Sequence, residues 1–433
     1  MFIFARGLIG VAAIGLVLLC AGCGRAPAAG TQESKGAAMR SERDPRAELV
    51  LEAAREGDAT RLRALLAEGA SALPHFDPQA ARERHRAAME QVKNAAAKVV
   101  ADEGLPFEID MEDYLPKEPT APYSHDIPLH CAAEAGSAEC IRLLIGAGAE
   151  VNLLDDSGAA ALHYAASAEA VRALVEAGAR TDIATEFGRD ALDEALERAW
   201  GEGEPDPSQL DVAAELVKSG VPLERADENG WSRLTQTAFR ENPLGVRFLL
   251  EAGHPVRDRG GYTALHSLCW HWDHDDPARD RVFPEIIQML LDAGLEVDTR
   301  DPHGNTALHE CVAGDGANAV AARYLLSKGA DVNAQNNEGQ TPLIYLYDTH
   351  FEYEKMVPLL LEHGANPLIR DKTGKNALDH ARDRAKGVEP KWRIDQFKEE
   401  GREIEADWKE KAKPGDAEHR MLQLMEKAAE KFR

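Results

Sequence analysis

Short apolar runs recur along the chain with the same polar surroundings each time. Each unit begins with a short segment that contains a leucine and is followed by small residues. A run rich in Leu and Val comes next, and a glycine such as Gly148, Gly178 or Gly329 ends the unit. Apolar positions three and four residues apart predict one buried helix face. A glycine directly after such a run is typical of a helix C-terminus. The pattern therefore predicts pairs of short helices that must stack, because one pair cannot bury its own apolar faces.

The first helix of each pair begins with a recurring signature. Its copies are Pro128-Leu129-His130, Ala161-Leu162-His163, Thr263-Ala264-Leu265-His266, Thr306-Ala307-Leu308-His309 and Thr341-Pro342-Leu343. This resembles the ankyrin-repeat family, whose unit of about 33 residues carries a T-P-L-H-x-A signature. The resemblance covers roughly residues 46–385 and implies an all-α solenoid of helix-turn-helix units with short β-turn tips. It also implies protein partners, met by the tips and first helices, and signature histidines that bond the backbone of the neighbouring unit.

The chain begins with a leader-like segment, residues 1–22. Arg6 precedes an apolar run from Leu8 to Cys20, which is short for a bilayer span and typical of a signal-peptide core. Small residues and then Cys23 follow, an order that resembles a bacterial lipoprotein leader. The resemblance implies lipidation of Cys23 and a place in the bacterial cell envelope, anchored in the outer membrane and facing the periplasm. An ordinary secretory signal or an uncleaved anchor is the alternative.

Composition divides the rest of the chain. Residues 23–45 are small and polar and predict a flexible tether, and 46–70 predict an N-terminal capping repeat. Residues 71–123 are a helical and Pro-rich insertion, which either packs on the array or extends from it as an arm. About eight repeats are expected in 124–385. Residues 386–433 predict two capping helices, because a solenoid would otherwise expose its core, although docking of a partner is the alternative.

Charge and motifs exclude several classes of function. The 433 residues include 50 Lys and Arg against 75 Asp and Glu, a net charge of −25, which disfavours nucleic acid and anionic lipid. We find no phosphate-binding loop, nucleophile elbow or zinc-protease motif, so neither an enzyme nor a cofactor or small-molecule substrate is predicted. Cys269 and Cys311 fall at small buried positions of successive first helices and are predicted to be free thiols. For Cys131 and Cys140 the sequence neither predicts nor excludes a disulfide.

Several units are lengthened between their two helices. The interval from signature Leu to final Gly is longer in Leu265–Gly294 than in Leu129–Gly148. Such loops either recognise a partner or vary neutrally. The longest one contains His271, His274 and Asp275, which could form a three-ligand zinc site or a solvated loop. A metal-binding protein or metalloenzyme centred there is therefore the alternative function.

The tips of the later units are basic although the protein is acidic. The candidate partner-binding residues combine these cations with two aromatics: Arg257, Arg259, Arg300, Arg370, Lys372, Lys375, Trp231 and Tyr262. Arg and aromatic residues are enriched at binding hot spots, although scattered surface charge would give the same list. The predicted function is a non-enzymatic, membrane-anchored scaffold for protein–protein interaction, and a periplasmic inhibitor or immunity protein is a sharper version of it.

Overall fold

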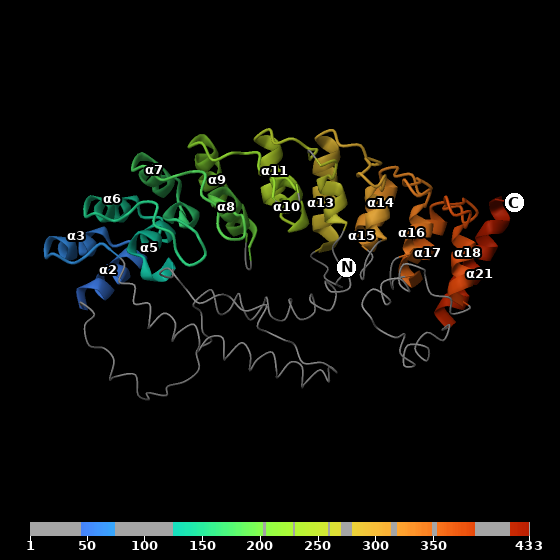
Figure 1. Ribbon diagram of the computed structural model, residues 1–433, viewed down its shortest axis with the longest axis horizontal. Helices are drawn as coiled ribbons and strands as arrows, with labels where there is room; N and C mark the ends of the chain where they lie inside the picture. The colour runs from blue at the N-terminus through green and yellow to red at the C-terminus, as the bar shows by residue number, and fades with distance from the viewer. Residues whose placement is uncertain are drawn as a thin grey trace, which may run out of the picture. The chain divides into compact units, whose positions relative to one another are not determined.

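The computed structural model describes residues 45–73, 124–201, 205–227, 230–258, 260–269, 279–312, 318–348, 353–385 and 416–432. Within these ranges the regular secondary structure is helical, and the extended contacts are two isolated antiparallel bridges, Ala226 with Ser232 and Arg370 with Asn376. The chain divides into two compact units, Met1–Ala199 with Pro205–Pro222, and Trp200–Glu204 with Leu223–Arg433. We call them unit 1 and unit 2. Each is a row of helix pairs (Figure 1).

Unit 1 stacks a row of first helices beside a row of second helices. The first helices are α2 (Pro45–Arg55), α5 (Pro128–Glu134), the 3₁₀ turn η3 (Ala161–Tyr164) and α8 (Ala191–Trp200), and the short turn η2 (Ser124–Asp126) precedes α5. The second helices are α3 (Ala59–Ala67), α6 (Ala138–Gly146), α7 (Ala168–Glu176) and α9 (Gln209–Lys218). Helix α5 packs on α2 and η3, and α6 packs on α3 and α7, so each pair stacks on the next.

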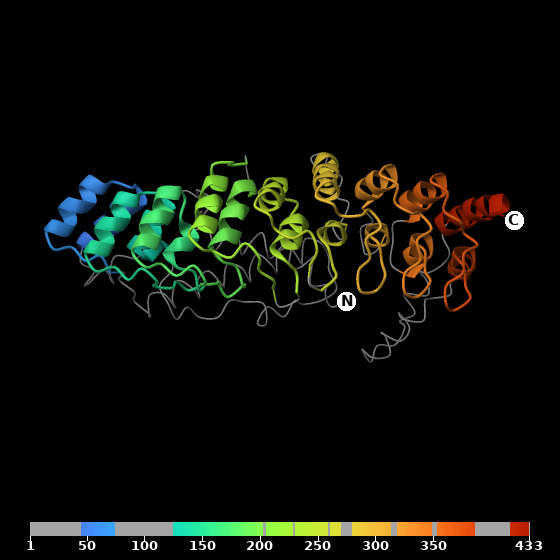
Figure 2. The same ribbon diagram turned by 90° about the horizontal axis from the view of Figure 1, so that it is seen from above.

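Unit 2 repeats this arrangement. Its first helices are α10 (Arg233–Phe239), α12 (Ala264–Leu268), α14 (Ala307–Cys311), α16 (Pro342–Asp348) and α18 (Ala377–Ala385). Its second helices are α11 (Pro243–Glu251), α13 (Arg279–Asp292), α15 (Ala319–Ser327), α17 (Tyr353–Glu362) and α21 (Asp416–Ala429), which the 3₁₀ turn η4 (Glu430–Phe432) follows. Seen from above, the turns that join successive repeats of unit 2 extend to the same side (Figure 2).

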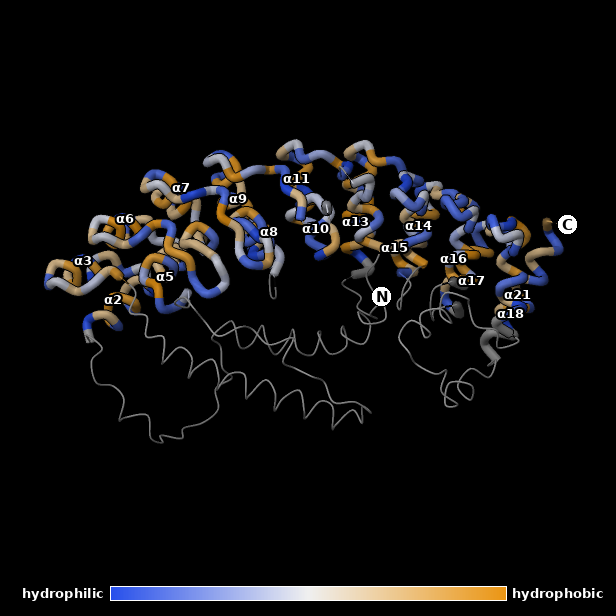
Figure 3. The backbone as a smooth tube through the Cα atoms, viewed as in Figure 1, coloured by the Kyte–Doolittle hydropathy of each residue, from blue (hydrophilic) through white to orange (hydrophobic). Residues whose placement is uncertain are grey.

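Stacking buries the apolar positions that the periodicity marks. Leu129, Leu162 and Leu308 of the first helices and Leu144 and Leu174 of the second helices are at most 1% exposed. Hydrophobic and hydrophilic stretches alternate along the helix pairs (Figure 3), as expected where each helix has one buried face. The core therefore runs between neighbouring repeats and is not enclosed by any one of them.

Glycine ends the second helices for a conformational reason. Gly148 and Gly329 have φ angles of 96° and 90°, in the left-handed region that side chains other than glycine rarely adopt. A Cβ atom built at either position meets nothing within 4 Å, so backbone conformation and not crowding requires the glycine. The sequence signal for the end of each helix is thus a local one.

The last described helix completes the final pair. Helix α21 packs against α17 and α18 and buries Met421, Met425 and Ala429, whereas Phe432, which follows it, is 43% exposed. The predicted leader and tether, nearly all of the 71–123 insertion, and residues 386–415 lie outside the described residues. Among the described helices, none combines the length and hydropathy that a membrane span requires.

Candidate functional site

The turn tips of unit 2 are built around an Asp or Asn side chain. Asp301 Oδ1 accepts hydrogen bonds from the backbone N–H groups of His303 and Asn305, both at 2.8 Å. Asp371 Oδ1 accepts from Thr373 at 2.8 Å and from Lys375 at 3.0 Å in the same way. A side chain that bonds its own turn holds the loop in one conformation. The tips are therefore ordered platforms that can present neighbouring side chains.

Successive tips also bond to one another through their backbones. The Asn337 N–H donates to the His303 carbonyl at 2.9 Å, and the Lys372 N–H donates to the Glu338 carbonyl at 2.9 Å. The approach is close, since a Cβ atom at Gly304 would lie 2.5 Å from Oδ1 of Asn337. Three consecutive tips of unit 2 thus form one continuous edge.

Side chains at one position of the tips reinforce this edge. The Arg300 guanidinium donates to the Gly304 carbonyl of its own tip at 2.8 Å and to the Gln335 carbonyl of the next tip at 2.5 Å. Gln335 repeats the arrangement, donating to Gly339 at 2.6 Å and to the Arg370 carbonyl at 3.1 Å. We call Arg300, Gln335 and Arg370 the tip ladder. The guanidinium of Arg300, a predicted partner-binding cation, therefore also joins its tip to the next one, whereas Arg370 takes part through its carbonyl.

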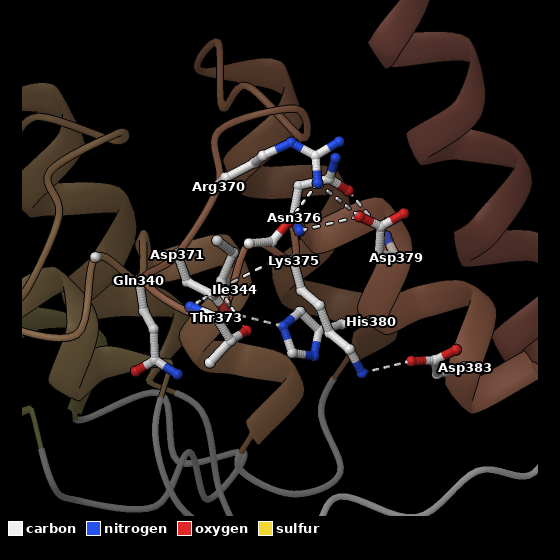
Figure 4. Close-up of polar contacts among 12 residues, drawn as sticks. Gln340, Ile344, Arg370, Asp371, Thr373, Lys375, Asn376, Asp379, His380 and Asp383 are labelled. Atoms are coloured by element: carbon white, nitrogen blue, oxygen red, sulfur yellow. Dashed lines mark hydrogen bonds and ion pairs between the residues drawn. The ribbon is translucent and has the colours of Figure 1, made fainter.

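The last tip has its own charged network with α18 (Figure 4). The Arg370 guanidinium donates to the Gly374 carbonyl and lies 3.5 Å from Oδ2 of Asp379. Lys375 Nζ donates to Asp383 Oδ2 at 2.8 Å, and this hydrogen bond raises the pKa of the lysine. Lys372 is exposed and contributes its backbone N–H to the edge. Of these three cations, Lys372 is the one whose replacement leaves the described side-chain contacts intact.

Asp371 is the buried anchor of that last tip. Its Oδ2 lies 3.2 Å from Nε2 of His380 on α18. Burial acts to raise the pKa of the Asp371 carboxyl, but hydrogen bonds from Thr373, His380 and the Lys375 amide outweigh it and hold the pKa below its usual value. The carboxylate is thus charged at neutral pH and serves to position the loop.

The remaining predicted tip residues are partly engaged within the protein. Arg257 is exposed, and its Nη2 lies 3.4 Å from Oγ1 of Thr299 on the next tip. Trp231 is half-buried and meets the Phe239 ring edge-on, with the centroids 5.5 Å apart. Tyr262 is half-buried, and burial raises the pKa of its hydroxyl. Arg259 lies outside the described residues. The structure thus carries Arg257, Arg300, Arg370, Lys372 and Lys375 on the exposed tips of unit 2.

Three of the four signature histidines connect repeats, as the resemblance implies. His163 does not, since its Nδ1 accepts from the Ala160 N–H of its own repeat at 3.1 Å and its buried Nε2 has no partner among the described residues. In unit 2, Nδ1 of His309 lies 2.9 Å from Oγ1 of Thr306, and Nε2 lies 3.0 Å from the Gln340 carbonyl of the next repeat. A carbonyl can only accept, so Nε2 carries the proton and Nδ1 accepts from the threonine. Burial lowers the pKa of His309 to about 4, which keeps the ring neutral. His266 bonds the Asn305 carbonyl at 3.1 Å and His130 bonds the Ala159 carbonyl at 3.2 Å, so these rings are structural.

One polar cluster beneath the tips was not predicted from the sequence. Asn305 Nδ2 donates to Oε1 of Glu310 at 2.9 Å, and Asn336 Nδ2 donates to Oδ1 of Asn305 at 2.9 Å, which links two repeats. Glu310 is only 5% exposed. The available signal was a glutamate directly after the signature histidine, where other repeats place Cys131 or Ser267. The cluster adds a second polar layer that fixes the register of the tips.

The other predicted sites fall outside the described part of the chain. Cys23, His271, His274 and Asp275 are all in ranges that the structure does not describe. Among the described residues, no group of three or more His, Cys, Asp or Glu side chains is placed to hold a metal ion. Lipidation and metal binding therefore stay predictions from the sequence.

Comparison with known proteins supports the repeat assignment. A family model described as "Ankyrin repeats (3 copies)" matches residues 85–185 and 277–371. The chain is 36% identical over 146 residues to the B-cell lymphoma 3 protein homolog of Mus musculus, covering 32% of this chain and 30% of that protein. It is 26% identical over 178 residues to the ankyrin repeat protein YahD of Escherichia coli (strain K12), covering 40% of this chain and 84% of that protein. The crystal structure of the human ASB11 ankyrin repeat domain matches at 20% identity with a TM-score of 0.42, covering 67% of this chain and 99% of that chain.

Proposed function

We propose that this chain, an all-α ankyrin-repeat solenoid, is a non-enzymatic scaffold that binds an acidic protein partner through the tips of unit 2. Ankyrin repeats generally mediate protein–protein interaction, and the matching family is a repeat family and not a catalytic one. The observation that carries the proposal is the continuous edge of bonded tips, on which Arg300, Arg370 and Lys372 are exposed, with Arg257 exposed on the tip before it. A rigid edge with exposed cations offers recognition at little cost in conformational entropy.

The charge of this edge supports an acidic partner. The chain as a whole carries a net charge of −25, whereas the first and last tips of the edge each present exposed cations, Arg300 on one and Arg370 with Lys372 on the other. Exposed cations steer an oppositely charged partner and raise the association rate, and salt screens that attraction within about 8–10 Å. Partner binding should therefore slow as ionic strength rises.

The sharpest test replaces Lys372, because this cation is exposed and the described network loses no side-chain bond with it. Lys372→Glu should reduce capture of the partner from solubilised envelope membranes, most strongly at low salt, with an unchanged melting temperature. Lys427→Glu is the matched control, since Lys427 is an exposed lysine on α21, away from the tips. Equal capture by both variants at low and high salt would exclude the tips as the binding surface.

Arg300 and Arg370 are less suitable for that test. Their reversal removes the bonds of the tip ladder as well as two surface charges. A loss of binding in Arg300→Glu would therefore combine a change in charge with a change in loop structure. Arg300→Lys separates the two effects, because it retains the charge but not the fork of donors. Capture at the wild-type level by Arg300→Lys would assign the loss in Arg300→Glu to the charge.

The same proposal includes a membrane anchor in the bacterial envelope. It is supported by the leader of residues 1–22, which resembles that of a bacterial lipoprotein, and by the tether of residues 23–45. Several acyl chains on Cys23 would anchor the chain stably, at roughly 0.8 kcal/mol for each buried methylene. Cys23→Ala should therefore give an unprocessed or soluble protein. Membrane fractionation of this variant at the processed wild-type mass would overturn the lipoprotein assignment.

A further inference from the structure

Two buried thiols from neighbouring repeats of unit 2 lie against each other. Cys269 follows the last residue of α12, and Cys311 is the last residue of α14. Their Sγ atoms are 2.7 Å apart, and the side chains are 1% and 0% exposed. Both sulfurs are present as free thiols. The separation is within about 0.7 Å of a covalent disulfide length.

We propose that Cys269 and Cys311 form a disulfide that joins the first helices of two successive ankyrin repeats. The oxidant is an external disulfide, either a small molecule such as oxidised glutathione or a dithiol–disulfide exchange protein. One cysteine thiolate attacks the external disulfide, forms a mixed disulfide and releases one thiolate. The second cysteine thiolate then attacks the protein sulfur of the mixed disulfide and releases the other thiolate. Two protein thiols are oxidised, one external disulfide is reduced to two thiols, and the protons pass to solvent and to the released thiolates.

The pairing is specific to these two cysteines. Helices α12 and α14 pack directly on each other, so the bond requires no change in which elements are neighbours. Cys131 and Cys140 of unit 1 are equally buried. The Cys131 thiol instead lies 3.9 Å from the Ser124 carbonyl and 3.6 Å from the His125 carbonyl, and Cys140 belongs to the next helix. Unit 1 therefore supplies an internal control with the same chemistry and burial.

Burial decides when the bond can form. The nucleophile is a thiolate, and burial together with the neighbouring thiol raises the pKa of Cys311 well above its usual value. The folded dithiol should consequently react slowly. Oxidation should be fast while unit 2 is still folding or is transiently open, when both sulfurs meet solvent. An oxidising compartment would therefore oxidise the pair during biogenesis.

The position of the bond gives it a structural consequence. Cys269 and Cys311 stand at the ends of their first helices, directly before residues 270–278 and closely before 313–317, the connections to α13 and α15. The bond closes a loop of 42 residues, which includes α13 and the tip of Arg300. A cross-link over a loop of this length removes much of the freedom of the unfolded chain. It would fix the interface between the two repeats from which the basic edge begins.

The test begins with the full chain, unfolded in reductant and refolded in a mixture of reduced and oxidised glutathione. The product is quenched in acid, alkylated under denaturing conditions and digested without reductant. We expect one peptide pair linked through Cys269 and Cys311, while Cys131 and Cys140 are alkylated. The native reduced chain in the same buffer should oxidise at least about tenfold more slowly. The oxidised chain should melt at least about 5 °C higher than the reduced chain.

Variants then separate the pair from the other cysteines. Cys131→Ala should keep the linked peptide and the shift in melting temperature, and Cys269→Ala should lose both. Should Cys269→Ala fail to fold, the comparison of oxidised with reduced wild-type protein still decides the question. Full alkylation of Cys269 and Cys311 after oxidative refolding would overturn the proposal. A bond that includes Cys131 or Cys140 would overturn it equally.

Discussion

The two units share one kind of side-chain tie between repeats, such as Asn152 to the Gly178 carbonyl in unit 1 and Asn333 to the Gly364 carbonyl in unit 2, but they differ in the ties added to it. In unit 1, Ser137 Oγ donates to the Gly57 carbonyl at 3.4 Å, and Ser167 Oγ donates to the Gly136 carbonyl at 2.8 Å. These ties join the turns between first and second helices. In unit 2, the tip ladder joins the turns between one repeat and the next. The added ties therefore lie within the helix pairs in unit 1 and at the tips in unit 2.

Local sequence explains why the added ties differ between the units. In unit 1 the turns that contain Gly57 and Gly136 are short. A Cβ atom at Gly136 would lie 3.3 Å from Cβ of Ser167, so neighbouring turns are in contact. In unit 2 the corresponding connections of α12 and α14 are lengthened. At the tips, unit 2 has the side chains that can bond to the next tip and unit 1 does not. Leu154 and Ala184 of unit 1 occupy the positions that Arg300 and Gln335 occupy in unit 2. A leucine or alanine side chain cannot donate to the next tip, whereas arginine and glutamine can.

The largest expected effect comes from the core, which both units share. Leu308 on α14 is fully buried between repeats, so Leu308→Ala should lower the free energy of unfolding by about 2–5 kcal/mol. The control is Leu424→Ala on α21, where the leucine is 41% exposed and the loss should stay within about 0.5 kcal/mol. Denaturant titration of both variants measures the difference. Equal losses would mean that the stacking core is not where the helix pairs place it.

The next effect concerns pH and the histidines between repeats. The pKa of His309 is lowered to about 4 in the folded protein, whereas the pKa of a histidine in the unfolded chain is about 6.5. The neutral ring therefore stabilises the fold above about pH 6.5, and this contribution is lost as pH falls toward 4. The loss should reach roughly 2–3 kcal/mol by pH 4.

The measurement compares wild type with His309→Gln, whose amide can still donate to the Gln340 carbonyl but does not titrate. Wild type should lose its advantage over the variant between pH 7 and pH 4. Because other groups titrate equally in both proteins, the difference between them isolates His309. A difference that stays constant with pH would show that the ring is not buried neutral between the two repeats.

The smallest effect sharpens the comparison of the two edges. Ser167→Ala should destabilise unit 1, and Arg300→Ala should destabilise unit 2, each by about 1 kcal/mol, the usual worth of a hydrogen bond within a protein. Hydrogen exchange of backbone amides can assign each loss to its unit. Ser167→Ala should increase exchange near Gly136, and Arg300→Ala should increase exchange near Gln335. Were Arg300→Ala to leave the tips of unit 2 as protected as before, the ladder would not contribute to their order.

The sequence alone predicted the helix pairs, their ends and the ankyrin-repeat solenoid. Periodic leucines mark the buried faces, glycines such as Gly148 mark the ends of helices, and the signature histidines predict bonds to the next repeat, which His130, His266 and His309 make. These features were predictable because each depends on a few residues of one unit and its immediate neighbour. The sequence also identified the basic tips, five of whose six cations the structure describes as exposed.

Only the tertiary structure decided what those side chains contact. The guanidiniums of Arg300 and Arg370 turn back to carbonyl groups of the tips, and Asn305, Glu310 and Asn336 form a cluster across two repeats. Cys269 and Cys311 are 42 positions apart in sequence, and the length of the intervening loop does not fix their separation in space. Such contacts depend on the stagger between stacked helices, to within an ångström. Hydrophobic periodicity specifies which face is buried but not that stagger, because many registers bury the same leucines.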